Sequence, residues 1–450
     1  MRSPCCESAK CPKDHQSSRW VCQTRRALLE LWFDFSCPYA YLASRRAHTL
    51  GVPIDWRPML LGGVFRGIGA GDGPMATLSA AKAAHNLHDM HRWAELFEVP
   101  FRMPAGHPMR TVRALRTLLG LPHSRWPVAI QAIYAAYWQR GEDVTKDDVI
   151  ASSLRNAGVT DSDISAALAA ADSEGIRDEL RRRTDEAIGL GIFGAPAWVW
   201  RRAGQDPLLV WGQDRLPWVQ AINAGWDPDV GPPPGGPHPL VAPGRAITSV
   251  EVYFDVSSPF AYLALTQLPA LMAAGAKPRL VPILLGALFR DIGQANVPLF
   301  AMPAPKTKYI GLEMSRWARW WGVPFVQPSK FPQRTVTAQR LALLAAERSV
   351  DDGVRMAIAL GRAMWAEQRD LEDTAQLARL LEREGFPAGW LAATQEPRVK
   401  QALAENTARA RANHVFGVPT FVVDGTYLFW GQDRLELVAK ALAGWKPKHE

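Results

Sequence analysis

Apolar runs of strand length and segments with helical spacing follow one another along this chain in an order that occurs twice. In each half, an apolar run leads into a serine-containing turn with a proline, a stretch of helical period follows, and a second apolar run comes next. Strand, helix and strand in this order begin a parallel α/β sheet. The predicted strands are residues 28–35 and 54–59 in the first half and 249–256 and 279–284 in the second.

A long helical segment follows the second predicted strand of each half. Residues 62–192 and 286–415 are rich in Ala, Leu, Arg and Glu at helical spacing. Two short strands and a closing helix then complete each half. This order predicts an α/β protein with two tandem thioredoxin-like domains, each with an α-helical insertion after the second strand. The late strands are expected at 197–200 and 208–211, and at 420–423 and 427–430.

Two motifs repeat almost unchanged. Trp-Phe-Asp-Phe-Ser-Cys-Pro-Tyr-Ala-Tyr-Leu-Ala at 32–43 returns at 253–264 as Tyr-Phe-Asp-Val-Ser-Ser-Pro-Phe-Ala-Tyr-Leu-Ala, and Trp-Gly-Gln-Asp-Arg-Leu occurs at 211–216 and 430–435. A repeat of about 220 residues is far longer than a solenoid unit and indicates two whole domains. A segment with seven prolines separates them and predicts a semi-rigid spacer. The expected parts are a disordered tail (1–27), a first copy (28–226), a linker (227–246) and a second copy (247–445).

Composition indicates a soluble globular protein, with 48% apolar and 21% charged residues. No apolar run approaches the roughly 18 residues of a membrane span, and the first 26 residues show no secretory signal. The net charge of +8 rests on short arginine clusters, which we interpret as solvated helix faces rather than a nucleic-acid surface. Four of five cysteines lie in the tail, at Cys5, Cys6, Cys11 and Cys22. A fold without a disulfide framework suits the cytoplasm.

Ser258 and Cys37 occupy the same position in the two copies, at the junction of a strand and a helix. Serine followed by proline is a common helix start, so capping alone explains Ser258-Pro259. A hydroxyl at a helix N-terminus also stabilises an anion such as a thiolate. By the same reasoning, Cys37 is expected to have a lowered pKa.

Further candidate positions repeat between the copies. Val418-Pro419 and Ala195-Pro196 each precede a strand, where a proline is commonly only a strand-start device. The Asp of each Trp-Gly-Gln-Asp-Arg motif, Asp433 or Asp214, could hold the amino group of a peptide ligand. Lys306 stands 17 residues before Val323-Pro324, and Lys82 stands 17 before Val99-Pro100. By the same offset, Asn296 matches Asp72.

Three histidines with helical spacing offer an alternative reading of the first copy. His85, His88 and His91, with Asp89 between them, could bind a metal ion. The second copy has tyrosine, leucine and serine at the matching positions, which disfavours a metal site common to both.

Together, the motifs Phe-Asp-x-x-Ser-Pro-x-x-Tyr-Leu, Val-Phe-Gly-Val-Pro-Thr and Trp-Gly-Gln-Asp-Arg-Leu resemble those of 2-hydroxychromene-2-carboxylate isomerases. These enzymes belong with the kappa-class glutathione transferases in the DsbA-like branch of the thioredoxin superfamily. The resemblance covers residues 249–444 well and 29–225 less well. It implies glutathione as cofactor, no metal, an aromatic carboxylate substrate and a cis proline before the third strand. It also implies an internal pseudo-dimer, because single-copy relatives are dimers.

The resemblance assigns roles to residues of the second copy. Ser258 would hydrogen-bond the glutathione sulfur, Val418 and Pro419 would clamp the peptide backbone, and Gln432 and Asp433 would hold the γ-glutamyl end. Asn296 and Lys306 would lie over the ligand. The matching residues of the first copy are Cys37, Lys82, Ala195, Pro196, Gln213 and Asp214.

The first copy departs from this pattern because Cys37 replaces the serine, and because Asp72 replaces an amide. Ala40 stands where a dithiol oxidoreductase needs a second cysteine, so dithiol exchange is not expected. Cys37 could still form a mixed disulfide with glutathione. The resemblance implies a glutathione-dependent isomerase with Ser258 and Cys37 as the catalytic candidates. The second copy is the better candidate for catalysis, and the diverged first copy is active, redox-sensitive or structural. The alternatives are a kappa-class glutathione transferase or peroxidase, a thiol oxidoreductase acting through Cys37, and a binding module without catalysis.

Overall fold

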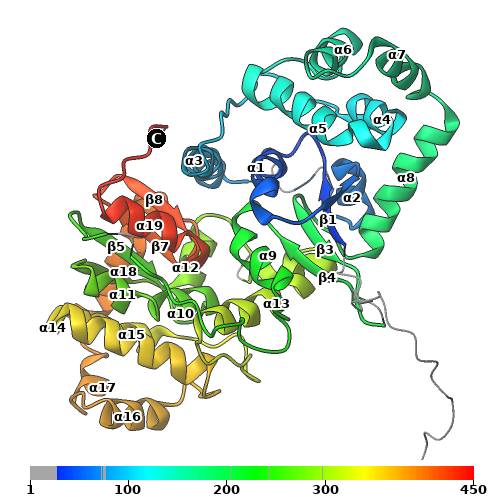
Figure 1. Cartoon of the computed structure of the whole chain (residues 1–450). Coiled ribbons are helices and arrows are strands. Elements are labelled where there is room, and N and C mark those ends of the chain that lie inside the picture. The colour runs from blue at the N-terminus through cyan, green and yellow to red at the C-terminus, as the bar shows by residue number, and fades with distance from the viewer. Residues whose placement is uncertain are drawn as a thin grey trace, which may run out of the picture.

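A computed structural model describes residues 28–71, 73, 78–202, 204–242, 244–295 and 297–449, and its two halves repeat one order of elements (Figure 1). The first copy consists of β1 (Leu29–Phe33), α1 (Pro38–Arg46), β2 (Ile54–Pro58), α2 (Leu61–Gly67), α3 (Ala80–Leu96), α4 (Val112–Gly120), α5 (Trp126–Ala135), α6 (Asp147–Asn156), α7 (Asp161–Ala170), α8 (Glu174–Gly189), β3 (Ala197–Trp200), β4 (Leu208–Trp211), the 3₁₀ turn η5 (Gln213–Arg215) and α9 (Leu216–Asn223).

The second copy follows the same plan. Its elements are β5 (Val250–Phe254), α10 (Pro259–Leu265), α11 (Leu268–Ala273), β6 (Pro278–Pro282), α12 (Leu285–Asp291), α13 (Ala304–Trp321), α14 (Val336–Arg348), α15 (Val350–Trp365), α16 (Thr374–Arg383), α17 (Trp390–Ala393), α18 (Pro397–Ala412), β7 (Thr420–Val423), β8 (Tyr427–Trp430), the 3₁₀ turn η7 (Gln432–Arg434) and α19 (Leu435–Leu442).

Each copy contains one four-stranded mixed sheet. The strand orders are β2-β1-β3-β4 and β6-β5-β7-β8, with the first pair parallel and the others antiparallel. The predicted α/β fold with two thioredoxin-like domains and helical insertions is confirmed. Because β3 runs against both of its neighbours, its beginning lies at the same sheet edge as the ends of β1 and β4. The corresponding edge of the second copy brings together the ends of β5 and β8 and the start of β7.

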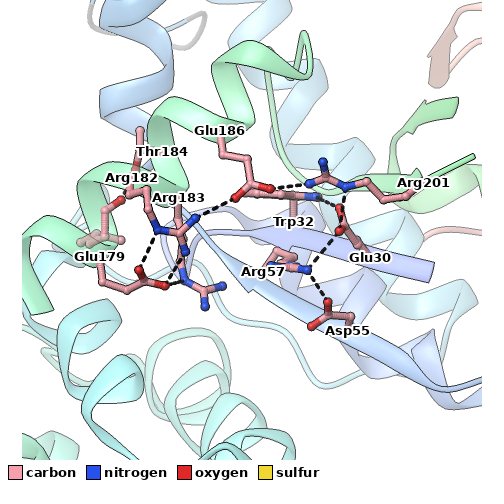
Figure 2. Close-up of polar contacts among 11 residues, drawn as sticks. Glu30, Trp32, Asp55, Arg57, Glu179, Arg182, Arg183, Thr184, Glu186 and Arg201 are labelled. Carbon is pink, nitrogen blue, oxygen red and sulfur yellow. Dashed lines mark hydrogen bonds and ion pairs between the residues drawn. The ribbon is translucent and has the colours of Figure 1, made fainter. Parts of the chain in front are cut away.

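Arginines of the first copy that could have formed a basic patch are paired with carboxylates. Arg182 and Arg183 of α8 both contact Glu179, as Figure 2 shows. Arg201 contacts Glu30, whose side chain is buried on β1, and also contacts α8. The Arg201 pairs connect α8 to the sheet, whereas the Glu179 pairs stay within α8.

The linker lies against the second copy. Asp229 pairs with Arg316 of α13 at 2.8 Å, and the ring of His238 stacks on Trp320 with centroids 4.4 Å apart. The C-terminal segment packs on the first copy in the matching way, since Trp445 donates its indole N–H to Glu95 of α3 over 2.8 Å. Both segments therefore help to fix the two copies against each other.

The predicted tail, residues 1–27, lies outside the described residues. None of the helices in the described part of the chain is both long and apolar enough to cross a lipid bilayer.

Candidate functional site

Three predicted motifs of the second copy contact one another at the sheet edge where β5 and β8 end. The Ser258 hydroxyl caps α10 by accepting the N–H of Ala261 and donates to the carbonyl of Val418, both over 3.3 Å. The N–H of Gly431 donates to the carbonyl of Pro419 over 3.0 Å. The serine, the proline loop and the Trp-Gly-Gln-Asp-Arg loop thus lie next to one another, and their role in binding a ligand stays a prediction.

The first copy repeats this arrangement with a thiol in place of the hydroxyl. The Cys37 sulfur lies 3.1 Å from the carbonyl of Ala195, and the N–H of Gly212 donates to Pro196 over 3.1 Å. The peptide bonds before Pro196 and Pro419 are both cis, so the predicted proline geometry is confirmed.

The expected lowering of the Cys37 pKa is wrong for this structure. Cys37 is only 7% exposed, and burial raises the pKa of its thiol from the ordinary value of 9.0 to about 12. The N–H groups of Ala40 and Tyr39 oppose this shift, while the nearby carboxylate of Asp34 adds to it. A buried site disfavours the charged thiolate more strongly than two N–H groups favour it. Cys37 is therefore a thiol at neutral pH.

Slow alkylation of Cys37 is the expected consequence. At pH 8, a thiol with a pKa of about 12 has a thiolate fraction about a thousandfold smaller than a thiol with a pKa of 9.0. Because a thiolate of higher pKa is also more nucleophilic, about twentyfold of the lost reaction rate is regained. We expect iodoacetamide to label Cys37 at least about fiftyfold more slowly in the folded protein than in urea, measured by mass spectrometry of its peptide. The rate should rise with pH up to about 12, and a plateau below pH 9 would contradict the buried thiol.

In each copy, a buried aspartate accepts hydrogen bonds from the segments that surround the site, and the sequence had given it no role. The Asp255 carboxylate accepts the N–H of Ser257, the N–H of Leu285 at the start of α12 and the hydroxyl of Thr335 at the start of α14. Burial raises the pKa of Asp255, and these hydrogen bonds act against that rise. Asp34 makes equivalent bonds in the first copy. The repeated Phe-Asp pair was the signal that could have identified both.

The site of the second copy also touches α3 of the first copy. The Lys82 ammonium lies 4.8 Å from the ring centre of Trp430, and the N–H of Trp430 donates to Nε2 of His85 over 3.2 Å. Asp89 holds Arg434 through both of its carboxylate oxygens, at 2.7 and 3.0 Å. Figure 1 shows α3 lying between the body of the first copy and the β8 end of the second.

Helix α13 of the second copy touches the first copy at the equivalent place. Lys306 lies 5.9 Å from the ring centre of Trp211, and the Tyr309 hydroxyl accepts the N–H of Trp211 over 2.9 Å. The sequence assigned Lys306 to the site of its own copy, whereas its aromatic contact belongs to the other copy. Burial lowers the pKa of both Lys82 and Lys306, and Lys306 lowers that of Lys82 further. Within the described ranges, neither lysine forms an ion pair with a carboxylate.

Four side chains of the two Gln-Asp-Arg turns form a closed ring of alternating charge, which we call the charge ring. Asp214 lies 2.8 Å from Arg215 and 2.6 Å from Arg434. Asp433 lies 2.8 Å from Arg215 and 3.1 Å from Arg434. Burial alone would raise the pKa of Asp433, yet the two arginines hold it below its usual value. The arginines were missed by the sequence analysis, although both recur in the motif.

The two ring aspartates differ in accessibility. The Asp433 side chain is 20% exposed and that of Asp214 only 6%, so a ligand amino group can reach the second copy's aspartate more easily. In the first copy, the amide nitrogen of Gln213 and the indole nitrogen of Trp211 are buried donors without a hydrogen-bond partner among the described residues. Buried donors of this kind are usually satisfied, so they suit the acceptor groups of a peptide ligand.

The remaining site residues that the sequence predicted are Asn296 and the histidines of α3. Asn296 and its counterpart Asp72 fall outside the described residues. His85 faces the second copy, while the ring of His91 lies 4.5 Å from that of His449. In the part of the chain that the structure describes, no three His, Cys, Asp or Glu side chains are grouped to hold a metal ion.

Comparison with known proteins agrees with the two-copy architecture. The family model described as DSBA-like thioredoxin domain matches residues 28–222 and again 249–443. Glutathione S-transferase kappa 1 of Rattus norvegicus is 28% identical over 202 residues, which cover 42% of this chain and 87% of that protein. The 2-hydroxychromene-2-carboxylate isomerase of Sphingobium xenophagum is 29% identical over 198 residues, which cover 43% of this chain and 96% of that protein.

Among solved structures, a 2-hydroxychromene-2-carboxylate isomerase is 24% identical with a TM-score of 0.39, over 43% of this chain and 94% of that one. The two matches to the family model cover most of the chain, one for each sheet and its inserted helices. The chain therefore belongs to the DSBA-like thioredoxin family and carries the family's domain twice.

Proposed function

We propose that this protein is a glutathione-dependent isomerase of the 2-hydroxychromene-2-carboxylate type, with the chemistry at the second copy. The observation that carries the proposal is the Ser258 hydroxyl, which caps α10 and lies 3.3 Å from the carbonyl of Val418. Ser258 is as buried as Cys37, at 6% and 7% exposed, so the two positions differ in chemistry: the first copy has a thiol whose pKa burial raises, which argues for a division of roles. The relatives named isomerase support the reaction class.

Glutathione fits the second copy's site through groups of known chemistry. The Ser258 hydroxyl would donate to the sulfur, and the backbone of Val418 before the cis proline would pair with the peptide in the manner of an added strand. Gln432 and Asp433 would hold the γ-glutamyl end. Lys82, which lies over Trp430, would supply positive charge for a carboxylate at this site, whereas Lys306 lies over Trp211 and would serve the first copy's loop. We retain Asn296 as a further contact.

When bound, glutathione would supply a thiolate that adds reversibly to the conjugated substrate, so that the former double bond rotates before elimination. The protein's part is to favour the thiolate and to orient the substrate. In the complex, the Ser258 hydroxyl would turn its one proton from the Val418 carbonyl toward the sulfur, and the N–H of Phe260 in the first turn of α10 would add a second donor. The substrate is proposed to be an aromatic carboxylate of the pyruvate type.

We further propose that the two copies associate as an internal pseudo-dimer. The charge ring and the reciprocal contacts of α3 and α13 support this, because each copy gives the other the same type of contact. The full chain would then be a monomer in solution. A mass measurement that finds dimers built through a single copy would contradict it. We also propose a cytoplasmic location, where Cys37, the cysteine within the described residues, would stay a free thiol.

The deciding experiment is a turnover assay with two substrates, each with and without glutathione. We expect glutathione-dependent isomerisation of a chromene carboxylate and little conjugation of a chlorinated nitrobenzene. The reverse result would favour the second candidate, a kappa-class glutathione transferase or peroxidase, which the relatives of that name support. A third candidate, a thiol oxidoreductase acting through Cys37, is disfavoured by the raised pKa of that thiol.

A further inference from the structure

We propose that His85 of the first copy is a positioning residue for the glutathione site of the second copy. Its imidazole fixes the backbone of residues 430–434, the loop that presents Gln432 and Asp433. The inference rests on the proposed function, since it concerns how that site is held in place. It gives the first copy a part in the reaction of the second, whatever the first copy itself binds.

The contact lies at the point where the loop leaves the sheet. The N–H of Trp430, the last residue of β8, donates to Nε2 of His85 over 3.2 Å. The next N–H along the chain, that of Gly431, donates to the carbonyl of Pro419 over 3.0 Å. Two consecutive amides are thus held, one by the first copy and one by the cis-proline loop. Loss of the hydrogen bond from the Trp430 N–H to His85 would free the loop on the side that faces the first copy.

Aromatic side chains enclose the ring of His85. The side chain is 7% exposed and packs edge-on against Phe416 and Trp430, with centroids 5.5 and 6.3 Å away. Burial lowers its pKa to about 4, and nearby Asp89 opposes this effect. The imidazole is therefore neutral at physiological pH. A neutral ring can accept the Trp430 N–H at Nε2 only with its proton on Nδ1.

The first copy's loop shows that the acceptor, not the side-chain type, is what the two copies share. The Tyr309 hydroxyl of α13 accepts the N–H of Trp211 over 2.9 Å, at the position of α13 that matches His85 of α3. Two chemically different side chains therefore supply an acceptor to the equivalent amide. Packing alone would not require an acceptor at either place, because a phenylalanine ring fills similar space.

The experiment compares His85→Tyr with His85→Phe, two rings that differ by one hydroxyl. The tyrosine keeps an acceptor and should leave the KM for glutathione within about twofold of wild type. The phenylalanine leaves the Trp430 N–H buried and unpaired, and should raise that KM about five- to tenfold while kcat changes less than twofold. Equal KM values for the two variants would overturn the proposal, because the ring would then act through packing alone.

Two controls keep the result independent of other failures. His85→Gln, which keeps an acceptor, and His85→Leu, which has none, repeat the comparison with smaller side chains in case the larger rings disturb folding. Tyr309→Phe removes the matching acceptor for the first copy's loop and should leave the KM of the second copy's reaction unchanged.

Amide hydrogen exchange of residues 427–435 tests the positioning without glutathione. We expect about tenfold faster exchange at Trp430 in His85→Phe than in His85→Tyr. Equal exchange rates would overturn the inference. If the wild type shows no glutathione-dependent turnover, the proposed function fails, and this exchange comparison still decides the role of His85.

Discussion

Replacement of Ser258 by alanine is expected to lower the isomerisation rate about a hundredfold, with glutathione affinity within about threefold of wild type. Removal of one hydrogen-bond donor that faces developing charge typically costs a factor of about 10²–10³ in rate. The variant removes the hydroxyl that donates to the Val418 carbonyl, while Gln432 and Asp433 make no contact with that hydroxyl. Titration with glutathione, read by thiolate absorbance across pH, should show a higher thiol pKa in the bound complex of the variant.

The first copy provides the matched control for this prediction. Cys37→Ala changes the equivalent position and should leave both the isomerisation rate and the thiolate signal as in wild type. Loss of isomerisation in Cys37→Ala, with normal activity in Ser258→Ala, would reverse the assignment of roles to the two copies. The Ser258→Ala change also removes a helix cap worth about 1 kcal/mol, so its folding is checked by thermal unfolding.

Replacement of Arg434 by methionine is expected to destabilise the protein by about 3–5 kcal/mol, the usual cost of removing one partner from a buried charge network. Asp89 would lose the guanidinium that contacts both of its oxygens, and the charge ring would open. The midpoint of the first urea transition should fall by roughly 1 M. The same change at Arg215 should have a similar effect, because Glu313 and Asp433 both depend on it.

An exposed ion pair serves as the comparison for the charge ring. Arg155 contacts Asp161 at 2.8 Å, and both side chains are more than half exposed. Solvent screens such pairs, so Arg155→Met should leave the urea midpoint within error of wild type. An equally small effect of Arg434→Met would mean that the charge ring does not hold the two copies together.

The fold could be predicted because its evidence is local and repeated. Strand-length apolar runs, the Ser-Pro and cis-proline motifs and the long helical segments recur in one order, so each copy supports the reading of the other. The sheet edge that joins Ser258, Val418 and Gly431 followed from that order. Strand pairing at that edge needed no knowledge of how the two copies are arranged.

The contacts between copies could not be predicted, because they join residues far apart in sequence. Nothing along the chain indicates that His85 meets Trp430 or that Asp89 meets Arg434, since a sequence does not specify how two domains are oriented. The prediction of a lowered Cys37 pKa was wrong for a related reason. Its place at a helix start is visible in the sequence, but its burial beside Asp34 depends on the packed structure, and burial dominates the pKa.

The charge ring joins two halves that one gene encodes, and this changes how the molecule can evolve. In an assembly of identical chains, every mutation appears in both partners at once. In this protein a mutation appears a single time, so the equivalent position can be Cys37 in one half and Ser258 in the other. Covalent duplication thereby permits asymmetry, because either half can change at a position that the other half keeps.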